Sequence, residues 1–252
     1  MQHQRRTVAV LTLATTTPGE PEIFASLQGE GPSAGAPVAF VRLSRCNLAC
    51  IWCDTAYTWH FEGDERPHRS GEHYDRKANQ LTLSPLETAQ RIAALGQNRL
   101  VITGGEPLLQ AGKLAEMLEH LPDIAVEIET NGTIDPPARL DVRVDQYNVS
   151  PKLAHSGNPA DLALKPAMLD RWATDPRAAF KFVIAEPTDL DQVHQLARTH
   201  AIPPARIWLM PEGTDSHTLR TREKWLAPLC WRHGYRMTDR LHIHLFGDTR
   251  GT

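Results

Sequence analysis

The chain has 252 residues, of which 41% are hydrophobic and 23% are charged, and its formal net charge is -3. This composition is typical of a globular protein, and the lack of a basic excess argues against nucleic acid as a direct partner. No stretch approaches the roughly 18 continuous apolar residues of a membrane span, so we expect no membrane partner. A chain of this length can bury a sizeable core, and we expect one domain over residues 1–252.

Residues 1–20 are interpreted as an N-terminal tail that leads into a first strand. Their apolar run, VAVLTLATTT, is short and interrupted by threonine, which is atypical of a secretory signal. Without an export signal we expect a cytoplasmic protein. Its cysteines then stay reduced and serve more often as metal ligands or catalysts than as disulfides.

Apolar, β-branched runs alternate with helical patterns over most of the chain, which is typical of parallel β/α units. Ser84, followed by a proline and by Glu87, marks the start of the clearest helix. Residues 60–80 are polar and lack apolar periodicity, so we expect a long loop or insertion there. The expected strands span residues 37–44, 99–103, 124–129, 146–150, 179–184, 206–210 and 241–246. The other expected helices span residues 113–121, 189–200 and 218–233.

Short polar motifs follow these strands: CNLAC after the first, GGEP after the second, TNGT after the third, PK after the fourth and PEG after the sixth. In a parallel β/α barrel the loops at the carboxyl ends of the strands meet at one mouth, where active sites are built. We therefore expect an α/β fold, a partial (β/α)6-type TIM-like barrel with about six strands, and one shared site.

Three of the four cysteines lie within one segment, SRCNLACIWCDT, residues 44–55. Four thiolates are the usual ligands of a structural zinc or a fully protein-ligated cubane cluster, whereas three leave one metal position open. The spacing of Cys46, Cys50 and Cys53 lets a short loop hold three corners of a four-iron, four-sulfur cluster. The alternative is a structural zinc with Cys230 or a histidine such as His60 as fourth ligand, although Cys230 is more simply a buried helical thiol.

This segment resembles the cysteine motif of the radical S-adenosylmethionine enzymes, in which an aromatic residue, here Trp52, precedes the last cysteine. The resemblance extends to TGGEP at Thr103–Pro107, where glycine lets the backbone approach the methionyl end of the cofactor. It implies a 4Fe-4S cluster whose open iron chelates S-adenosyl-L-methionine, cleavage to a 5′-deoxyadenosyl radical, and a flavodoxin- or ferredoxin-type reductant. The implied cofactor contacts are Trp52, Asp54, Gly105, Ser150, Pro151, Lys152, Met210, Pro211, Glu212 and Gly213.

Within that superfamily the chain is similar to the 7-carboxy-7-deazaguanine synthase family, from SLQGEG at residues 26–31 to the C-terminal GDTRGT. Members of that family are lyases of queuosine and 7-deazapurine biosynthesis. They convert 6-carboxy-5,6,7,8-tetrahydropterin to 7-carboxy-7-deazaguanine with ring contraction and loss of ammonia. The resemblance implies that this chain uses a small-molecule pterin substrate, requires Mg2+ and forms a homodimer.

The resemblance also places substrate contacts around the mouth. Gln28 and Glu30 would hydrogen-bond the guanidine-like edge of the pterin, and Arg42 would clamp its carboxylate. Thr55 matches the Mg2+ position, where substrate and water supply most of the ligands. The implied substrate contacts are Leu27, Gln28, Gly29, Glu30, Arg42, Thr103, Glu129, Asn131, His242 and Thr252.

Simpler interpretations stay open for several of these residues. LQGEG and SPK are common turn sequences, Arg42 could form a surface ion pair, and Thr55 could cap a turn. His244 competes with His242 because both share the parity of the expected last strand. Two other functions are also open, a glycyl-radical-enzyme activase that uses the same cysteine loop and a zinc-stabilised binding module with no catalytic activity.

Overall fold

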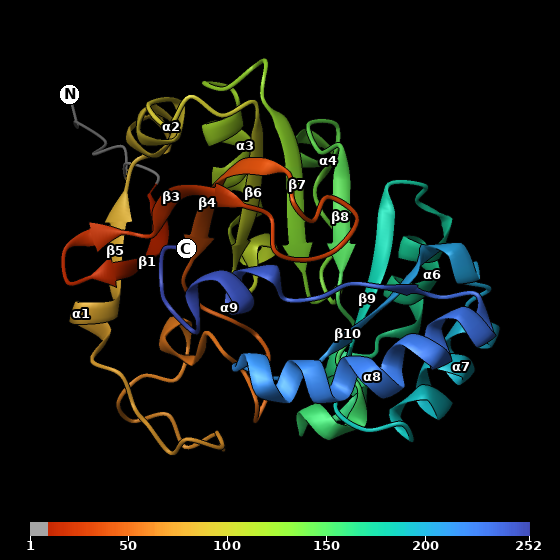
Figure 1. The fold of residues 1–252 in the computed structure, drawn as a ribbon. Coiled ribbons are helices and arrows are strands. Elements are labelled where there is room, and N and C mark those ends of the chain that lie inside the picture. The colour runs from red at the N-terminus through yellow and green to blue at the C-terminus, as the bar shows by residue number, and fades with distance from the viewer. Residues whose placement is uncertain (1–9) are drawn as a thin grey trace, which may run out of the picture.

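Parallel strands form the centre of the fold, which the computed structural model describes for residues 10–252 (Figure 1). These strands are β4 (Pro37–Leu43), β6 (Arg99–Gly104), β7 (Ala125–Thr130), β8 (Gln146–Val149), β9 (Ala178–Ile184), β10 (Ile207–Pro211) and the short β11 (Arg236–Met237). Each pairs in parallel with the next in that order. The sheet stays open, since β11 lies at one end of the strand order and antiparallel strands extend the other. The partial (β/α)6-type barrel predicted from the sequence is confirmed.

Antiparallel strands extend the sheet on its N-terminal side. They are β1 (Leu11–Thr17), β2 (Glu20–Pro21), β3 (Ile23–Leu27) and β5 (Gln80–Leu83). Both β1 and β3 pair with β4, and β5 pairs with β1. Residues 11–17, which we had assigned to the N-terminal tail, are therefore a largely buried strand of the sheet. Residues 1–9 of the predicted tail lie outside the described part of the chain.

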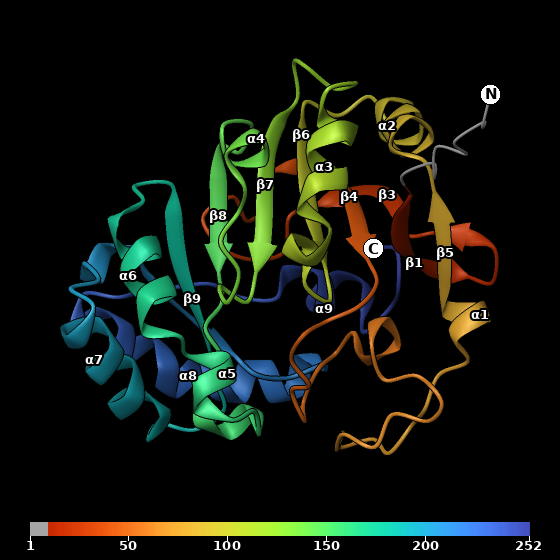
Figure 2. The same cartoon turned by 180° about the vertical axis from the view of Figure 1, so that it is seen from behind.

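Helices cover the face of the sheet that is turned away from the C-terminal segment (Figure 2). They are α2 (Pro85–Ala93), α3 (Ala111–Leu118), α4 (Ala138–Asp141), α5 (Ala160–Ala163), α6 (Pro166–Thr174) and α7 (Asp189–Thr199). Helix α8 (Ser216–His233) packs against β10 and β11 and lies behind them in Figure 2. As the sequence predicts, Ser84 caps α2: its hydroxyl accepts a hydrogen bond from the Glu87 amide at 3.1 Å, and Pro85 opens the first turn. No helix within residues 10–252 has the length and apolar content needed to cross a membrane.

Residues 60–75 form a loop with no helix and only one isolated β-bridge, between Phe61 and Tyr74, whereas the residues after it are structured. Residues 76–80 enter the short helix α1 (Arg76–Asn79) and the start of β5. Asp75 caps α1 by accepting hydrogen bonds from two backbone amides. Within the loop, the two ring nitrogens of His60 lie 2.6 and 3.0 Å from the carbonyl oxygens of Glu72 and Arg66. The loop therefore has a defined path across the molecule.

The prediction of a strand over residues 241–246 is wrong, because this segment forms helix α9 (Leu241–Phe246). The sheet position beside β10 is taken by β11, so the chain has no strand partner there. It instead crosses the mouth of the barrel toward the N-terminal strands, as Figure 1 shows. There the Leu241 amide donates a hydrogen bond to the Gly29 carbonyl. The alternation of apolar residues in this short run did not distinguish a strand from a helix.

Alternation along the central strands separates an apolar face from a polar one. On β7, Val126 and Ile128 are fully buried in the main core that packs against the helices. Their neighbours Glu127 and Glu129 point the other way, because successive side chains of a strand face opposite sides. Lys181 occupies the same position on β9, between Phe180 and Phe182. The polar face is where the candidate site lies.

Candidate functional site

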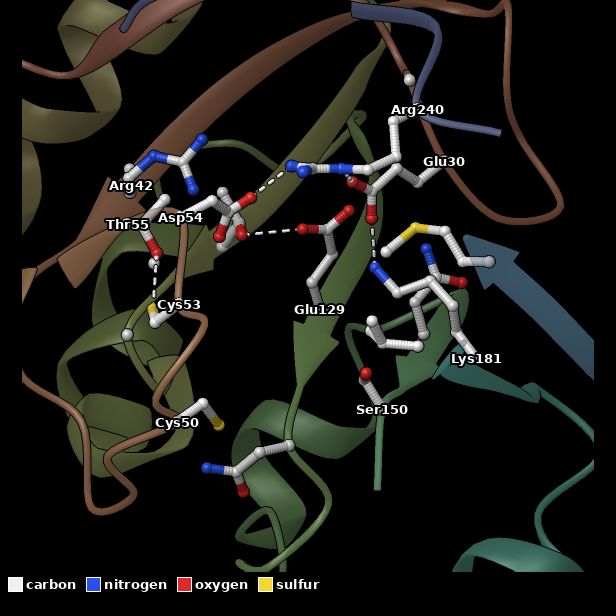
Figure 3. Close-up of a pocket in the computed structure, with 18 of the residues that line it drawn as sticks. Glu30, Arg42, Cys50, Cys53, Asp54, Thr55, Glu129, Ser150, Lys181 and Arg240 are labelled. Carbon is white, nitrogen blue, oxygen red and sulfur yellow. Dashed lines mark hydrogen bonds and ion pairs between the residues drawn. The ribbon is translucent and has the colours of Figure 1, made fainter. Parts of the chain in front are cut away.

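One pocket opens at the carboxyl ends of the parallel strands (Figure 3). It brings together motifs that lie more than 200 residues apart, from Leu27 near the start of the chain to Thr252 at its end. Of the predicted site residues, all line this pocket except Pro151 and Pro211, which are buried beside it. The convergence expected from the barrel architecture is therefore present.

The cysteine loop follows β4 and contributes all three of its thiols to the pocket wall. Burial raises the pKa of Cys46 to about 12 and that of Cys53 to about 11, and it also raises the pKa of Cys50. Metal binding requires the thiolate form, so a bound cation would have to drive deprotonation at this site. Thiols with a raised pKa carry little thiolate at neutral pH and are poor nucleophiles unless a cation binds them.

The spread of the three thiols tests which metal group they fit. Three thiolates on one tetrahedral zinc, at about 2.3 Å from the ion, would lie about 3.8 Å apart. Within residues 10–252, only Glu223, Asp239 and His244 bring three potential donor atoms within 4.8 Å of one another. The three cysteine sulfurs do not all lie within that distance, so they are not arranged as ligands of one zinc ion. A cluster in which each cysteine binds its own iron does not require them to be that close.

The two proposed fourth ligands of the zinc alternative are engaged elsewhere. Both ring nitrogens of His60 lie within hydrogen-bond distance of loop carbonyl oxygens, which turns the ring toward the loop. Cys230 lies on α8, where its sulfur contacts the Arg236 carbonyl at 3.7 Å, and burial raises its pKa to about 11. Cys230 is a buried helical thiol, as the sequence predicts.

The glycines of GGEP pack directly against the cysteine loop. Gly104 has φ of +141°, and a Cβ atom there would lie 2.1 Å from the Leu43 carbonyl oxygen. A Cβ atom on Gly105 would lie 2.2 Å from the Arg45 carbonyl oxygen and 2.9 Å from the Cys46 Cβ. Only glycine fits these positions, so the motif supports the cysteine loop as well as lining the pocket.

A buried ion network crosses the middle of the pocket. Glu30 forms ion pairs with Lys181 and, at 3.1 Å, with Arg240, and Arg240 also pairs with Asp54 (Figure 3). Burial alone would raise the pKa of Glu30, but the two cations outweigh it and hold that pKa well below its usual value. Lys181 and Arg240 are 7% and 5% exposed.

Neither cation of this network was predicted from the sequence. Lys181 carries a signal in retrospect, because it is the one charge in the apolar strand AAFKFVI and an unpaired lysine would not be buried there. Arg240 lies in an irregular segment before α9, and no pattern marks it.

A hydrogen-bonded wall lies beside the network. The Gln28 side-chain amide donates to Glu127 at 2.8 Å and to Glu129 at 3.1 Å. The Thr103 hydroxyl donates to the other oxygen of Glu129 at 2.7 Å. Glu127 is fully buried behind the pocket, and burial raises its pKa. Glu127 was also missed by the sequence reading, although it fixes the orientation of Gln28.

Arg42 and Thr55 face the pocket from the cysteine side (Figure 3). The Arg42 Nε donates to Glu22 at 2.7 Å, and Glu22 is fully buried, so this is not a surface ion pair. The terminal nitrogens of Arg42 make no hydrogen bond to any other residue of the described chain. The Thr55 hydroxyl lies 3.6 Å from the Cys53 sulfur.

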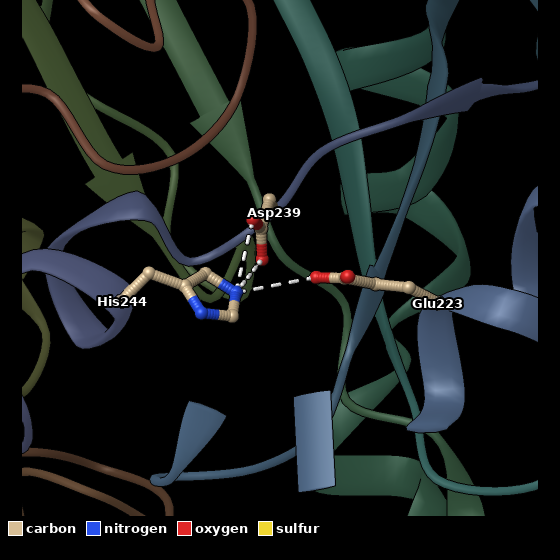
Figure 4. A group of neighbouring side chains, drawn as sticks. All are labelled: Glu223, Asp239 and His244. Carbon is tan, nitrogen blue, oxygen red and sulfur yellow. Dashed lines mark hydrogen bonds and ion pairs between the residues drawn. The ribbon is translucent and has the colours of Figure 1, made fainter. Parts of the chain in front are cut away.

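The structure separates the two competing histidines. His242 lines the pocket and accepts a hydrogen bond from Arg240 at 3.3 Å. His244 contacts Glu223 at 3.4 Å and Asp239 at 3.2 Å instead (Figure 4). Shared strand parity does not apply, because residues two apart on a helix point in nearly opposite directions. Only His242 lies in the candidate site.

Comparison with known proteins places this geometry in context. Residues 41–152 match the family model of the Radical SAM superfamily. Two relatives named 7-carboxy-7-deazaguanine synthase match most of the chain. The one from Pyrobaculum aerophilum is 37% identical, covering 91% of this chain and 95% of its own length. The one from Thermoplasma acidophilum is 43% identical, covering 91% and 98%. The crystal structure of QueE from Escherichia coli has a TM-score of 0.65 at 26% identity, covering 92% of this chain and 95% of that one.

Proposed function

The chain belongs to the 7-carboxy-7-deazaguanine synthase family of the radical S-adenosylmethionine superfamily, and from that premise we propose how its pocket supports the family reaction. It is a radical S-adenosylmethionine lyase with a 4Fe-4S cluster. Its reaction converts 6-carboxy-5,6,7,8-tetrahydropterin to 7-carboxy-7-deazaguanine in the route to queuosine and other 7-deazapurines. The roles of individual residues in that reaction are the content of the proposal.

Cys46, Cys50 and Cys53 hold the cluster in this proposal. When bound, the cluster and S-adenosylmethionine supply a carbon radical that abstracts hydrogen from the substrate. The role of the protein is to position the cofactor and the substrate and to exclude water from the pocket. Lys152, whose ammonium donates to the Ser150 hydroxyl at 2.8 Å, offers a fixed cation to the cofactor's carboxylate. The full set of proposed cofactor contacts is Trp52, Asp54, Gly105, Ser150, Pro151, Lys152, Met210, Pro211, Glu212 and Gly213.

The proposed substrate contacts come from several sides of the same pocket. The free terminal nitrogens of Arg42 suit the carboxylate of a pterin acid. Gln28 and Glu129 offer an amide and a carboxylate for the donor-rich pyrimidine edge. Burial lowers the pKa of His242, so at neutral pH its imidazole is uncharged and accepts as well as donates hydrogen bonds. Leu27, Gly29, Glu30, Thr103, Asn131 and Thr252 complete the proposed contacts.

Thr55 is the proposed protein ligand of Mg2+. A single hydroxyl fits the usual Mg2+ site, in which substrate oxygens and water supply most of the six ligands. Its place between the cysteine loop and Arg42 would put the ion beside the substrate carboxylate. A cation there would orient that carboxylate and stabilise charge that develops on it.

The proposal extends to the setting in which the protein works. We propose a flavodoxin- or ferredoxin-type electron donor, a homodimer and a cytoplasmic location. The absence of a disulfide among residues 10–252, in which all four cysteines are free, agrees with a reducing compartment.

One observation carries the proposal: three closely spaced cysteines of one loop share a pocket with a free arginine end and a wall of carboxylates and amides. A glycyl-radical-enzyme activase must admit a protein backbone, whereas these groups suit a small carboxylated heterocycle. The test is anaerobic reconstitution of the wild type, Cys50→Ala and Cys230→Ala. We expect the wild type and Cys230→Ala to contain iron and sulfide and to cleave S-adenosylmethionine. We expect Cys50→Ala not to cleave it. One zinc and no sulfide in the wild type would contradict the proposal.

A further inference from the structure

Each cysteine sulfur of the loop accepts one N–H hydrogen bond, and two of the three donors are side chains. The Leu48 backbone amide lies 3.4 Å from the Cys46 sulfur. The Trp59 indole N–H lies 3.4 Å from the Cys53 sulfur, and the Asn158 side-chain amide lies 3.2 Å from the Cys50 sulfur. We propose that Trp59 and Asn158 set the reduction potential of the cluster through these two bonds. The inference rests on the proposed function, because it requires the cluster.

Trp59 is held in place by the polar loop of residues 60–75. Its ring is 4% exposed and lies 5.0 Å from the ring of His60 and 6.2 Å from that of His68, measured between centroids. The Arg66 guanidinium lies 4.8 Å from the centre of the Trp59 ring. His68 also contacts the Cys53 carbonyl at 2.8 Å. The loop therefore fixes the indole N–H against the sulfur and covers this side of the cluster site.

Asn158 reaches the cysteine loop from the segment between β8 and α5. Its side-chain oxygen accepts a hydrogen bond from the Ala49 amide at 2.8 Å, which orients its NH2 group toward Cys50. A further bond from the Ile51 amide to the Ser156 carbonyl, at 2.9 Å, joins the two segments. The donor is thus fixed by partners on both sides of Cys50.

The direction of the effect follows from charge. Reduction adds one electron to the cluster and increases the negative charge on its sulfur ligands. An N–H donor stabilises that charge more in the reduced state than in the oxidised state, and burial strengthens the interaction. Hydrogen bonds to the sulfurs are a known determinant of cluster potentials. Loss of either donor should therefore make the cluster harder to reduce.

The test is a redox titration of the reconstituted protein, followed by electron paramagnetic resonance without S-adenosylmethionine. Trp59→Phe keeps an aromatic ring and removes the N–H, and Asn158→Leu keeps the approximate size of the side chain and removes the donor without adding a charge. We expect each to disfavour reduction about tenfold, which is about 59 mV for a one-electron couple. Trp231→Phe is the matched control, because Trp231 is 74% exposed on α8. The reduction potential of the cluster should not change in this variant.

The outcomes separate this inference from the proposed function. A wild type that assembles no 4Fe-4S cluster would contradict the proposed function itself. Fully loaded Trp59→Phe and Asn158→Leu proteins with unshifted potentials would overturn the present inference alone. If Trp59→Phe cannot hold the cluster, Asn158→Leu decides the question. Loss of the cluster in both would also overturn it, because these donors would then serve assembly and not potential.

Discussion

Arg240 forms an ion pair with Asp54, the residue that directly follows the last cysteine of the loop (Figure 3). The same guanidinium donates to Glu30 at 3.1 Å and to the Gly213 carbonyl at 2.6 Å. One buried side chain therefore joins the cysteine loop, the loop that carries Glu30 and the loop after β10. Since radical transfer requires close alignment of the two reactants, we expect this link to matter for coupling.

Arg240→Gln should uncouple cleavage of S-adenosylmethionine from formation of deazaguanine. It leaves Glu30 with one cation and Asp54 with none, which should lower the free energy of unfolding by about 3 kcal/mol. The yield of deazaguanine per 5′-deoxyadenosine formed should also fall, because the substrate is less well aligned. Urea unfolding measures the change in stability, and mass spectrometry measures the ratio of deazaguanine to 5′-deoxyadenosine. Arg139→Gln, in an exposed pair with Glu119, is the control and should change neither. An unchanged product ratio in Arg240→Gln would rule out the coupling role.

Glu30 should make the free energy of unfolding depend on pH in the acidic range. Its pKa in the folded protein lies below the ordinary value of 4.5, so its contribution is fully present above about pH 4.5 and is lost as the pH falls. The wild type should therefore be more stable than Glu30→Gln at pH 7. That difference should shrink by about 1.4 kcal/mol for each pH unit below 4.5. Urea unfolding of both proteins at pH 7, 4 and 3 measures the trend, and a constant difference would contradict it.

Two glycine substitutions should fail in different ways. A Cβ atom on Gly29 would lie 2.1 Å from the His242 ring, so Gly29→Ala should displace that side chain and lower product formation by about tenfold to a hundredfold. Iron content should stay normal.

A Cβ atom on Gly105 would strike the backbone of the cysteine loop, so Gly105→Ala should lose iron. Normal iron in Gly105→Ala, or lost iron in Gly29→Ala, would show that the two loops are misassigned.

Thr55→Ala should affect Mg2+ and not the cluster. If Thr55 is the protein ligand, its loss should weaken the dependence of turnover on Mg2+ concentration and slow the reaction about tenfold or more, because the substrate carboxylate is less well oriented. Iron and sulfide content should match the wild type. Thr55→Ser, which keeps the hydroxyl, should restore the response to Mg2+. Kinetics of Thr55→Ala that match the wild type at every Mg2+ concentration would exclude this role.

Periodicity and motif spacing predicted six of the seven parallel strands, the main helices and the motifs that share the mouth. These features depend on local residue patterns, which a single sequence displays. The helix at residues 241–246 was not predictable in this way, because it depends on β11 occupying the neighbouring sheet position.

The cations of the ion network were missed for a related reason. Glu30 and Arg240 are 210 residues apart in the chain, and no local pattern reports such a pair. Residues whose roles depend on distant partners, such as Trp59 and Asn158, become visible only when the fold places them. The loop of residues 60–75 shows the same limit, since its composition predicts a loop but not its contact with Cys53.

The most direct test of the account is anaerobic turnover of the reconstituted protein. The assay contains reductant, Mg2+, S-adenosylmethionine and 6-carboxy-5,6,7,8-tetrahydropterin, and mass spectrometry follows the product. The account predicts 7-carboxy-7-deazaguanine in the wild type and neither product nor 5′-deoxyadenosine in Cys50→Ala. Formation of 5′-deoxyadenosine without deazaguanine in the wild type, despite an intact cluster, would contradict the assigned reaction.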